Sequence, residues 1–187
     1  MKPRKPIRSR KTPMDDIPDL FPSIFAYGAL VQFCLENIPE VAKTGWHDET
    51  EVIKALDQAP LPVQDVASAI SEYFEIMLEI DEDNLRPGED PPDLSIYTHH
   101  TPEELYGKVD TKHLLATAFL LYLKQYSPKL GEEVMQKWKN NEDIETESSQ
   151  TLTHMNDLPV HIQHGMVRAD NALLRFEEWA NSGKSEP

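Results

Sequence analysis

The chain has little cysteine, little glycine and no long apolar run, and each shortage excludes a class of protein. Its single cysteine, Cys34, excludes a disulfide framework and a cysteine-based zinc site. With only seven glycines, the chain has no glycine-rich loop that could cradle a phosphate, and neither GxGxxG nor a P-loop motif is present. No stretch reaches the about 20 apolar residues that span a bilayer. The basic N-terminus leads into MDDIPDL rather than an apolar segment, so we expect no secretory signal peptide and a cytoplasmic protein.

Acidic residues dominate the composition, and the basic residues are unevenly spread. The 187 residues include 33 acidic and 18 basic side chains, a formal net charge of −15. Six of the 18 cations lie in the first eleven residues, which leaves 12 cations against 33 carboxylates, a net charge of −21, in residues 12–187. A body of this charge repels nucleic-acid phosphates, so affinity for nucleic acid would have to come from the N-terminal arm.

The N-terminal arm MKPRKPIRSRKTP contains three prolines and few apolar residues, and we expect residues 1–18 to be a disordered basic tail. One interpretation is a solubilising or self-docking tail. Another is a basic arm for nucleic acid or an acidic partner, and a transit peptide is a third. The cations of the arm are Lys2, Arg4, Lys5, Arg8, Arg10 and Lys11.

The pattern of prolines and apolar residues predicts an all-α protein. Prolines fall between apolar segments, and no clear alternation of apolar and polar residues indicates a strand. We expect a single bundle of about six to seven helices over residues 19–182, with loops at 81–100 and 140–157 and a disordered C-terminus at 183–187. Residues 22–37 are apolar almost all round, which predicts a central helix that Pro39 ends.

Local capping signals place the helices that follow. A helix is expected after Asp48, and a third one from near Pro62, with an apolar stripe that runs to Ile80. Residues 81–93 hold six carboxylates and three prolines, which predicts an acidic loop that stays exposed. Further helices are expected after Thr101, after Asp110, from Ser127-Pro128, and over 159–181.

The last helix carries two stripes with different character. Its apolar stripe either closes the chain's own bundle or docks into a partner or a second copy, as in a homodimer. Its members are Ile162, Met166, Ala169, Leu173, Phe176 and Ala180. The opposite side carries the only cationic stripe of the body: His161, His164, Arg168 and Arg175. This stripe is interpreted as a solvated face or as a contact for an acidic partner.

A metal site on this helix is the weakest alternative. His161 and His164 are three residues apart, and Asp157 lies one turn earlier. Arg168 would repel a bound cation, however, and we expect Asp157 to cap the helix instead. No HExxH or ExxH spacing occurs, and the grouping of His99, His100, His154 and His161 into one site has no support from spacing. We therefore expect no catalytic residue, metal or cofactor, and we expect Cys34 to be a buried, inert thiol.

These observations favour a non-catalytic, acidic, helical protein-binding factor, such as an adaptor, an inhibitor or a chaperone-like regulator, with a basic protein as partner. The expected partner-binding residues are Trp138, Trp179, His161, His164, Arg168 and Arg175. Further candidate anchors are Trp46 and Tyr97. A mimic of nucleic acid is disfavoured because carboxylates 81–93 and 142–147 are predicted in loops. The alternatives are a nucleic-acid-associated regulator that uses the basic arm and a histidine-based metal protein or enzyme.

Overall fold

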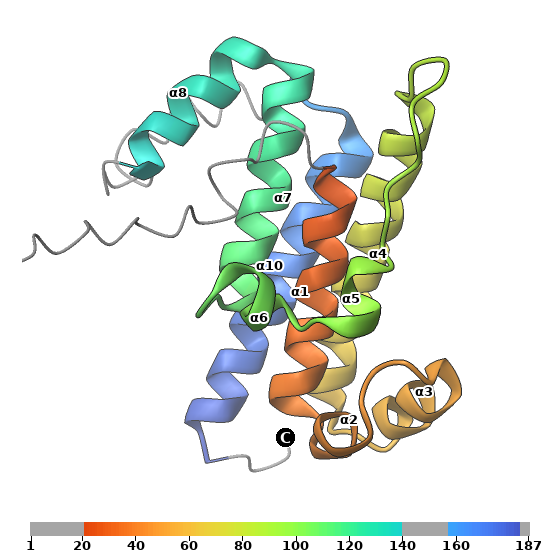
Figure 1. Ribbon diagram of the computed structural model, residues 1–187. Helices are drawn as coiled ribbons and strands as arrows, with labels where there is room; N and C mark the ends of the chain where they lie inside the picture. Colours follow the sequence, from red (N-terminus) through yellow and green to blue (C-terminus); the bar gives the residue numbers. More distant parts are fainter. Residues whose placement is uncertain (1–20, 140–156, 184–187) are drawn as a thin grey trace, which may run out of the picture.

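The computed structural model describes residues 21–139 and 157–183, without the side chains of residues 137–139. In this part of the chain there are nine helices and no strand, which confirms the all-α prediction (Figure 1). The helices are α1 (Pro22–Asn37), α2 (Pro39–Thr44), α3 (Glu49–Asp57), α4 (Leu61–Asp83), α5 (Ile96–His99), α6 (Pro102–Tyr106), α7 (Thr111–Tyr126), α8 (Pro128–Lys139) and α10 (Val160–Asn181). None of the described helices is long and apolar enough to cross a membrane.

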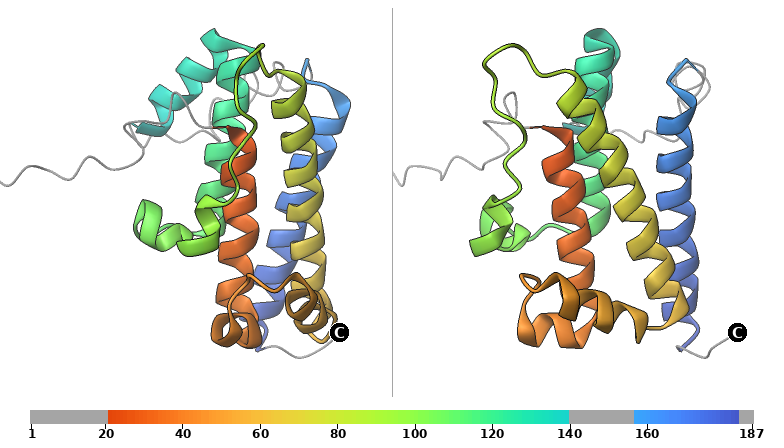
Figure 2. Two further views of the ribbon diagram at one scale, coloured as in Figure 1. Left: turned by 45° about the vertical axis from the view of Figure 1, so that its right-hand side comes forward. Right: turned by 90° about the vertical axis from the view of Figure 1, so that its right-hand side faces the viewer.

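Four long helices form the bundle, and α1 lies at its centre. Helix α1 packs against α4 and α7, and α10 packs along α4 (Figures 1 and 2). Helices α1 and α10 run in one direction, whereas α4 and α7 run in the other (Figure 1). The rings of Phe33 in α1 and Phe176 in α10 meet edge to face, with centroids 5.3 Å apart, so α10 also closes over α1.

The position of each long helix follows from its apolar pattern. Helices α1 and α7 are apolar on nearly all sides and are covered on several sides, as expected of central helices. Helix α4 buries one face, including Val66, Ile70 and Tyr73, and exposes its acidic side. In α10, Ile162, Ala169 and Leu173 are buried, so the apolar stripe of this helix packs into its own bundle.

Side-chain caps start several helices where the sequence predicts them. Asp48 accepts a hydrogen bond from the backbone N–H of Glu51, and Asp110 accepts one from that of His113. Thr101 and Glu104 form a complete capping box at the start of α6. That helix ends at Gly107, whose φ of 82° lies in the left-handed region that favours glycine.

Two local predictions are wrong, and one short helix is not predicted. Helix α1 ends at Asn37, before Pro39, as predicted, but Pro39 also begins α2, because a proline suits the first position of a helix. Helix α4 continues through Asp83, and Asp81 is buried with 1% of its surface exposed, so the segment 81–93 is neither all loop nor all exposed. Asp157 does not cap α10: the N-cap is Pro159, and no side chain caps that end.

Helix α8 leaves the bundle at a sharp corner after α7. A Cβ atom on Gly131 would lie 2.6 Å from Cα of Lys124, so only a glycine lets the two helices approach this closely. Helix α8 packs against α7 and projects from one end of the bundle (Figure 1). Trp138 is a predicted partner-binding residue, and its side chain lies outside the part of the chain that the structure describes.

Candidate protein-interaction surface

Helix α4 has the most one-sided charge of the described helices. Its 23 residues include seven carboxylates and no lysine or arginine. The carboxylates are Asp65, Glu72, Glu75, Glu79, Asp81, Glu82 and Asp83. All except Asp81 lie off the buried face, since the residues that pack into the bundle recur at helical spacing on the other side.

The segment after α4 extends this negative charge. We call residues 84–95 the strap: it leaves the end of α4, loops outward and returns alongside α1 to α5 (Figure 2). Its carboxylates are exposed, and Arg86 is its only cation. We define the acidic surface as six of the exposed carboxylates of the last turns of α4 and of the strap: Glu75, Glu82, Asp83, Glu89, Asp90 and Asp93.

Local hydrogen bonds shape the strap. The backbone N–H of Arg86 donates to Glu89 Oε2 over 3.0 Å, which closes a turn. The backbone N–H of Ser95 donates to Asp93 Oδ1 over 3.0 Å, and the hydrogen bonds from Ser95 lower the pKa of the Asp93 carboxyl. These hydrogen bonds favour the ionised form of the Asp93 carboxyl.

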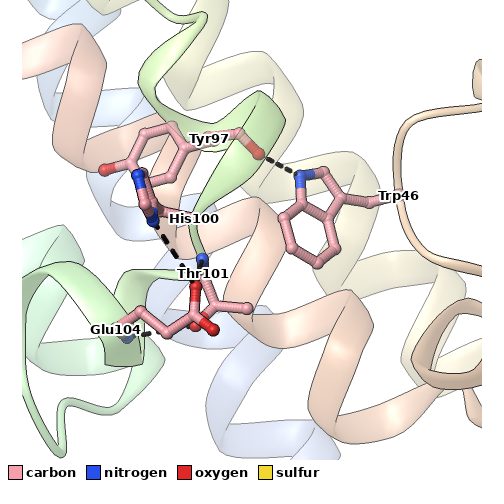
Figure 3. A network of polar contacts seen from close by, with 5 residues as sticks. All are labelled: Trp46, Tyr97, His100, Thr101 and Glu104. Atoms are coloured by element: carbon pink, nitrogen blue, oxygen red, sulfur yellow. Dashed lines mark hydrogen bonds and ion pairs between the residues drawn. The ribbon is translucent and has the colours of Figure 1, made fainter.

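The far end of the strap is fixed to the bundle by Tyr97. This residue is 1% exposed, and its backbone carbonyl accepts a 2.7 Å hydrogen bond from Trp46 Nε1 (Figure 3). Its hydroxyl lies 3.2 Å from that of Tyr106, and its ring packs beside that of Tyr27. The ring also sits over Gly28, where a Cβ would lie 2.3 Å from the Tyr97 hydroxyl oxygen. The prediction that Tyr97 is an exposed anchor is therefore wrong.

The near end of the strap is fixed by a buried carboxylate. The backbone N–H of Ser23, in the first turn of α1, donates to Asp81 Oδ2 over 2.8 Å. Burial raises the pKa of Asp81 to about 6, and the hydrogen bonds from Ser23 oppose that rise. The acidic surface thus begins at a helix end that is held in place by packing and by a hydrogen bond.

The predicted cationic stripe lies along α10, and one of its members contacts α4. Its residues His161, His164, Arg168 and Arg175 are exposed. The guanidinium of Arg168 forms an ion pair with Glu72 of α4. Their role in binding a partner stays a prediction.

The aromatic candidates are less exposed than the sequence indicates. Trp179 is half-buried and packs against the core, with its ring 5.8 Å from that of Phe176. Trp46 is also half-buried and packs against the core. The exposed apolar residues of α10 are instead Val160, Val167 and Leu174, which recur every seven residues on its outer side.

Among the described residues, no group of three or more His, Cys, Asp or Glu side chains is close enough to hold a metal ion. Asp157, His161 and His164 are all exposed. The backbone carbonyl of Asp157 accepts a 3.3 Å hydrogen bond from the Tyr126 hydroxyl, which ties the start of α10 to the end of α7. His154 lies outside the described residues.

Cys34 is 4% exposed, and burial raises the pKa of its thiol to about 11. The prediction of a buried cysteine is confirmed, and a thiol of this pKa is a poor nucleophile at neutral pH. The basic arm, residues 2–11, lies outside the described part of the chain.

The charge of residues 81–93 is evident in the sequence, but the sequence did not predict that Glu82 and Asp83 belong to α4 and so continue the acidic side that carries Glu75. Their signal is the complete absence of lysine and arginine from residues 61–83, since an ordinary exposed helix face mixes both signs. The chain matches no protein-family model, and it shows no significant similarity to a curated protein or to a solved structure.

Proposed function

We propose that this chain is a non-catalytic protein-binding factor that recognises a basic partner through its acidic surface. The observation that carries the proposal is the run from residue 61 to residue 93, which has ten carboxylates and one cation, Arg86. An exposed surface of one sign raises the rate of encounter with a partner of the opposite sign and disfavours partners of the same sign.

The anchoring of the strap supports the same proposal. A fully mobile acidic loop loses conformational entropy when it binds, whereas a loop fixed at both ends loses less. The strap is held by Asp81 at one end and by Tyr97 at the other, so its carboxylates are kept within a limited region of the surface. Such preorganisation favours a partner with a defined arrangement of lysine and arginine side chains.

The test compares two variants of equal net charge. In the first, the six carboxylates of the acidic surface are neutralised: Glu75→Gln, Glu82→Gln, Asp83→Asn, Glu89→Gln, Asp90→Asn and Asp93→Asn. In the matched control, six exposed carboxylates elsewhere are neutralised: Glu36→Gln, Glu40→Gln, Glu49→Gln, Asp57→Asn, Glu103→Gln and Glu178→Gln. The full chain and both variants are used as bait in an extract of the source cells, and retained proteins are quantified.

We expect the full chain and the control to retain the same basic protein. The first variant should lose at least about tenfold of the affinity for it, because charges at the edge of an interface raise the rate of encounter and are screened by salt. Equal retention by both variants would show that the acidic surface is not the contact. Retention lost in both variants would point to net charge alone.

A further inference from the structure

The start of α1 lies next to the acidic surface. The described part of the chain begins at Phe21, two residues before Ser23, whose backbone N–H donates to Asp81 Oδ2 in the last turn of α4. Glu75 and Asp83, the first and last carboxylates that α4 gives to the acidic surface, lie within about 9 Å of Asp81 along the helix axis. The strap passes the start of α1 on its way to α5 (Figure 2). The chain that precedes Phe21 therefore joins the bundle beside both parts of the acidic surface.

The same junction contains a buried acceptor without a donor. Asp81 Oδ1 has no hydrogen-bond partner among the described residues, although Asp81 is only 1% exposed. Because Oδ1 and Oδ2 belong to one carboxyl group, this acceptor also lies at the first turn of α1. A buried acceptor that lacks a donor costs free energy, and the cost is larger for a charged group. The junction therefore favours a segment that brings positive charge and hydrogen-bond donors.

The segment that joins the bundle here carries the matching charge. Residues 2–11 hold six cations and no carboxylate, whereas residues 12–20 hold three carboxylates and no cation. Ten residue steps separate Lys11 from Phe21, which allows a reach of at most about 36 Å. This reach is enough to bring residues 2–11 to the acidic surface. The covalent link also keeps the two opposite charges at a local concentration of about millimolar.

We propose that the basic arm, residues 2–11, docks on the acidic surface of its own chain and competes with the basic partner for it. The arm has six cations and the acidic surface has six carboxylates, so the two match in number and are opposite in sign. A contact that separate molecules would form only at about millimolar concentration is about half formed when one chain carries both sides. The inference rests on the proposed function, because it concerns regulation of the same surface: a docked arm lowers the apparent affinity for a partner.

The first experiment detects docking without a partner. A nitroxide spin label is attached to the full chain through Ser9→Cys, and Cys34 stays unlabelled because it is 4% exposed. Paramagnetic relaxation of backbone amide signals is compared between residues 88–90 of the strap and residues 40–43 of α2, at the other end of the bundle (Figure 1). The reference has an arm of equal length in which all six cations are replaced by glutamine.

At low salt, paramagnetic relaxation of the strap amides in the full chain should be at least about threefold that in the reference, and high salt should remove this excess. The variant with the neutralised acidic surface should lose the excess, whereas the matched control with six other carboxylates neutralised should keep it. The inference is wrong if the full chain and the reference agree, or if the variant with the neutralised acidic surface keeps the excess. It is also wrong if spin-labelled chains produce the excess in separate, isotope-labelled chains, because the arm would then bind a second copy.

The second experiment measures competition, with decalysine as the basic probe. The chain with the neutral arm has a net charge of −21 (−15 − 6). A control of the same net charge carries glutamine at six exposed cations elsewhere: Lys43→Gln, Lys54→Gln, Lys108→Gln, Lys124→Gln, Lys129→Gln and Arg175→Gln. Fluorescence anisotropy at low salt should show that the chain with the neutral arm binds decalysine at least about twofold more tightly than the control. Equal affinities would show that the arm does not compete.

The two experiments separate this inference from the proposed function. Decalysine that bound the variant with the neutralised acidic surface as tightly as the full chain would count against the proposed function. The relaxation experiment would still decide whether the arm docks, because it contains no partner.

Discussion

The backbone N–H of Ser23 donates a 2.8 Å hydrogen bond to Asp81 Oδ2, and this contact joins the first turn of α1 to the last turn of α4. The N-cap residue of α1 is Phe21, which has no side chain able to cap. A carboxylate 58 residues later takes that place. The contact therefore links two requirements of the fold, a cap for the central helix and a fixed starting point for the strap.

The buried carboxylate predicts an unusual dependence of stability on pH. The pKa of Asp81 is about 6 in the folded chain and near 3.8 when the group is in water, so the folded state binds the proton more tightly. The stability contributed by the neutral form is complete below pH of about 3.8 and is lost as pH rises through about 6.

Asp81→Asn keeps an oxygen that can accept the hydrogen bond from Ser23 and carries no charge. At pH of about 7.5 we expect this variant to be more stable than the original chain by about 1–3 kcal/mol.

The measurement is urea unfolding as a function of pH, in which the advantage of Asp81→Asn should vanish near pH of about 4. Glu82→Gln is the matched control, since this neighbour is exposed and should show no such crossover. If Asp81→Asn were instead less stable at every pH, attraction of the carboxylate to the N-terminus of α1 would outweigh the cost of its burial.

The contact between Gly28 and Tyr97 predicts a reversal of the usual helix preference. Alanine in a helix interior is ordinarily about 1 kcal/mol better than glycine. Here the added Cβ would lie 2.3 Å from the Tyr97 hydroxyl oxygen and 2.8 Å from Cζ. We expect Gly28→Ala to destabilise the chain by about 1–3 kcal/mol, because Tyr97 of α5 must move away from α1.

A double-mutant cycle with Tyr97→Phe separates this clash from other effects. Removal of the hydroxyl eliminates the closest contact, so Gly28→Ala should cost less in the Tyr97→Phe background than in the original chain. Tyr97→Phe alone should cost about 1 kcal/mol through the lost hydrogen bond to Tyr106. Equal costs of Gly28→Ala in both backgrounds would show that the contact with the Tyr97 hydroxyl is not the source of the cost.

Much of the fold could be predicted because its signals are local. Pro22 and Asn37 bound α1 as the apolar run indicates, and the Thr101 capping box starts α6. Helix α2 was not predicted for a reason that is also local: Pro39 suits the start of a helix as well as the residue after one, and the sequence does not show that it does both.

The parts of the candidate site that could not be predicted depend on distant contacts. Asp81 stands among carboxylates and near prolines, which is typical of exposed loops, yet its hydrogen bond to Ser23 spans 58 positions. Arg168 belongs to a stripe that reads as a solvated face, and its partner Glu72 is 96 positions away. Tyr97 precedes two polar histidines, and only the approach of α1 shows that its ring is enclosed.

The basic arm leads to a prediction about nucleic acid. Residues 12–187 carry a net charge of −21, so any affinity for nucleic acid should reside in residues 1–11. Deletion of residues 1–12 should abolish binding to a short DNA duplex and to single-stranded RNA at low salt. For the full chain, log K against log salt should have a slope no steeper than about −5, because the arm has six cations. Fluorescence anisotropy measures both. Affinity that survives the deletion would place a second site in the helical body.

The ring pair Phe33 and Phe176 predicts an unequal cost for two chemically identical substitutions. Phe33 is 1% exposed and lies inside the core, whereas Phe176 is half-buried at the edge of α10. Phe33→Ala should destabilise the chain by about 3–5 kcal/mol, because it removes a fully buried ring and leaves a cavity. Phe176→Ala should cost about 2 kcal/mol, because water can reach the space that it leaves.

Urea unfolding measures both costs. The double variant should cost less than the sum of the two single variants, since the ring centroids lie 5.3 Å apart and each ring contacts the other. An equal cost for the two single variants would show that α10 buries Phe176 as deeply as α1 buries Phe33.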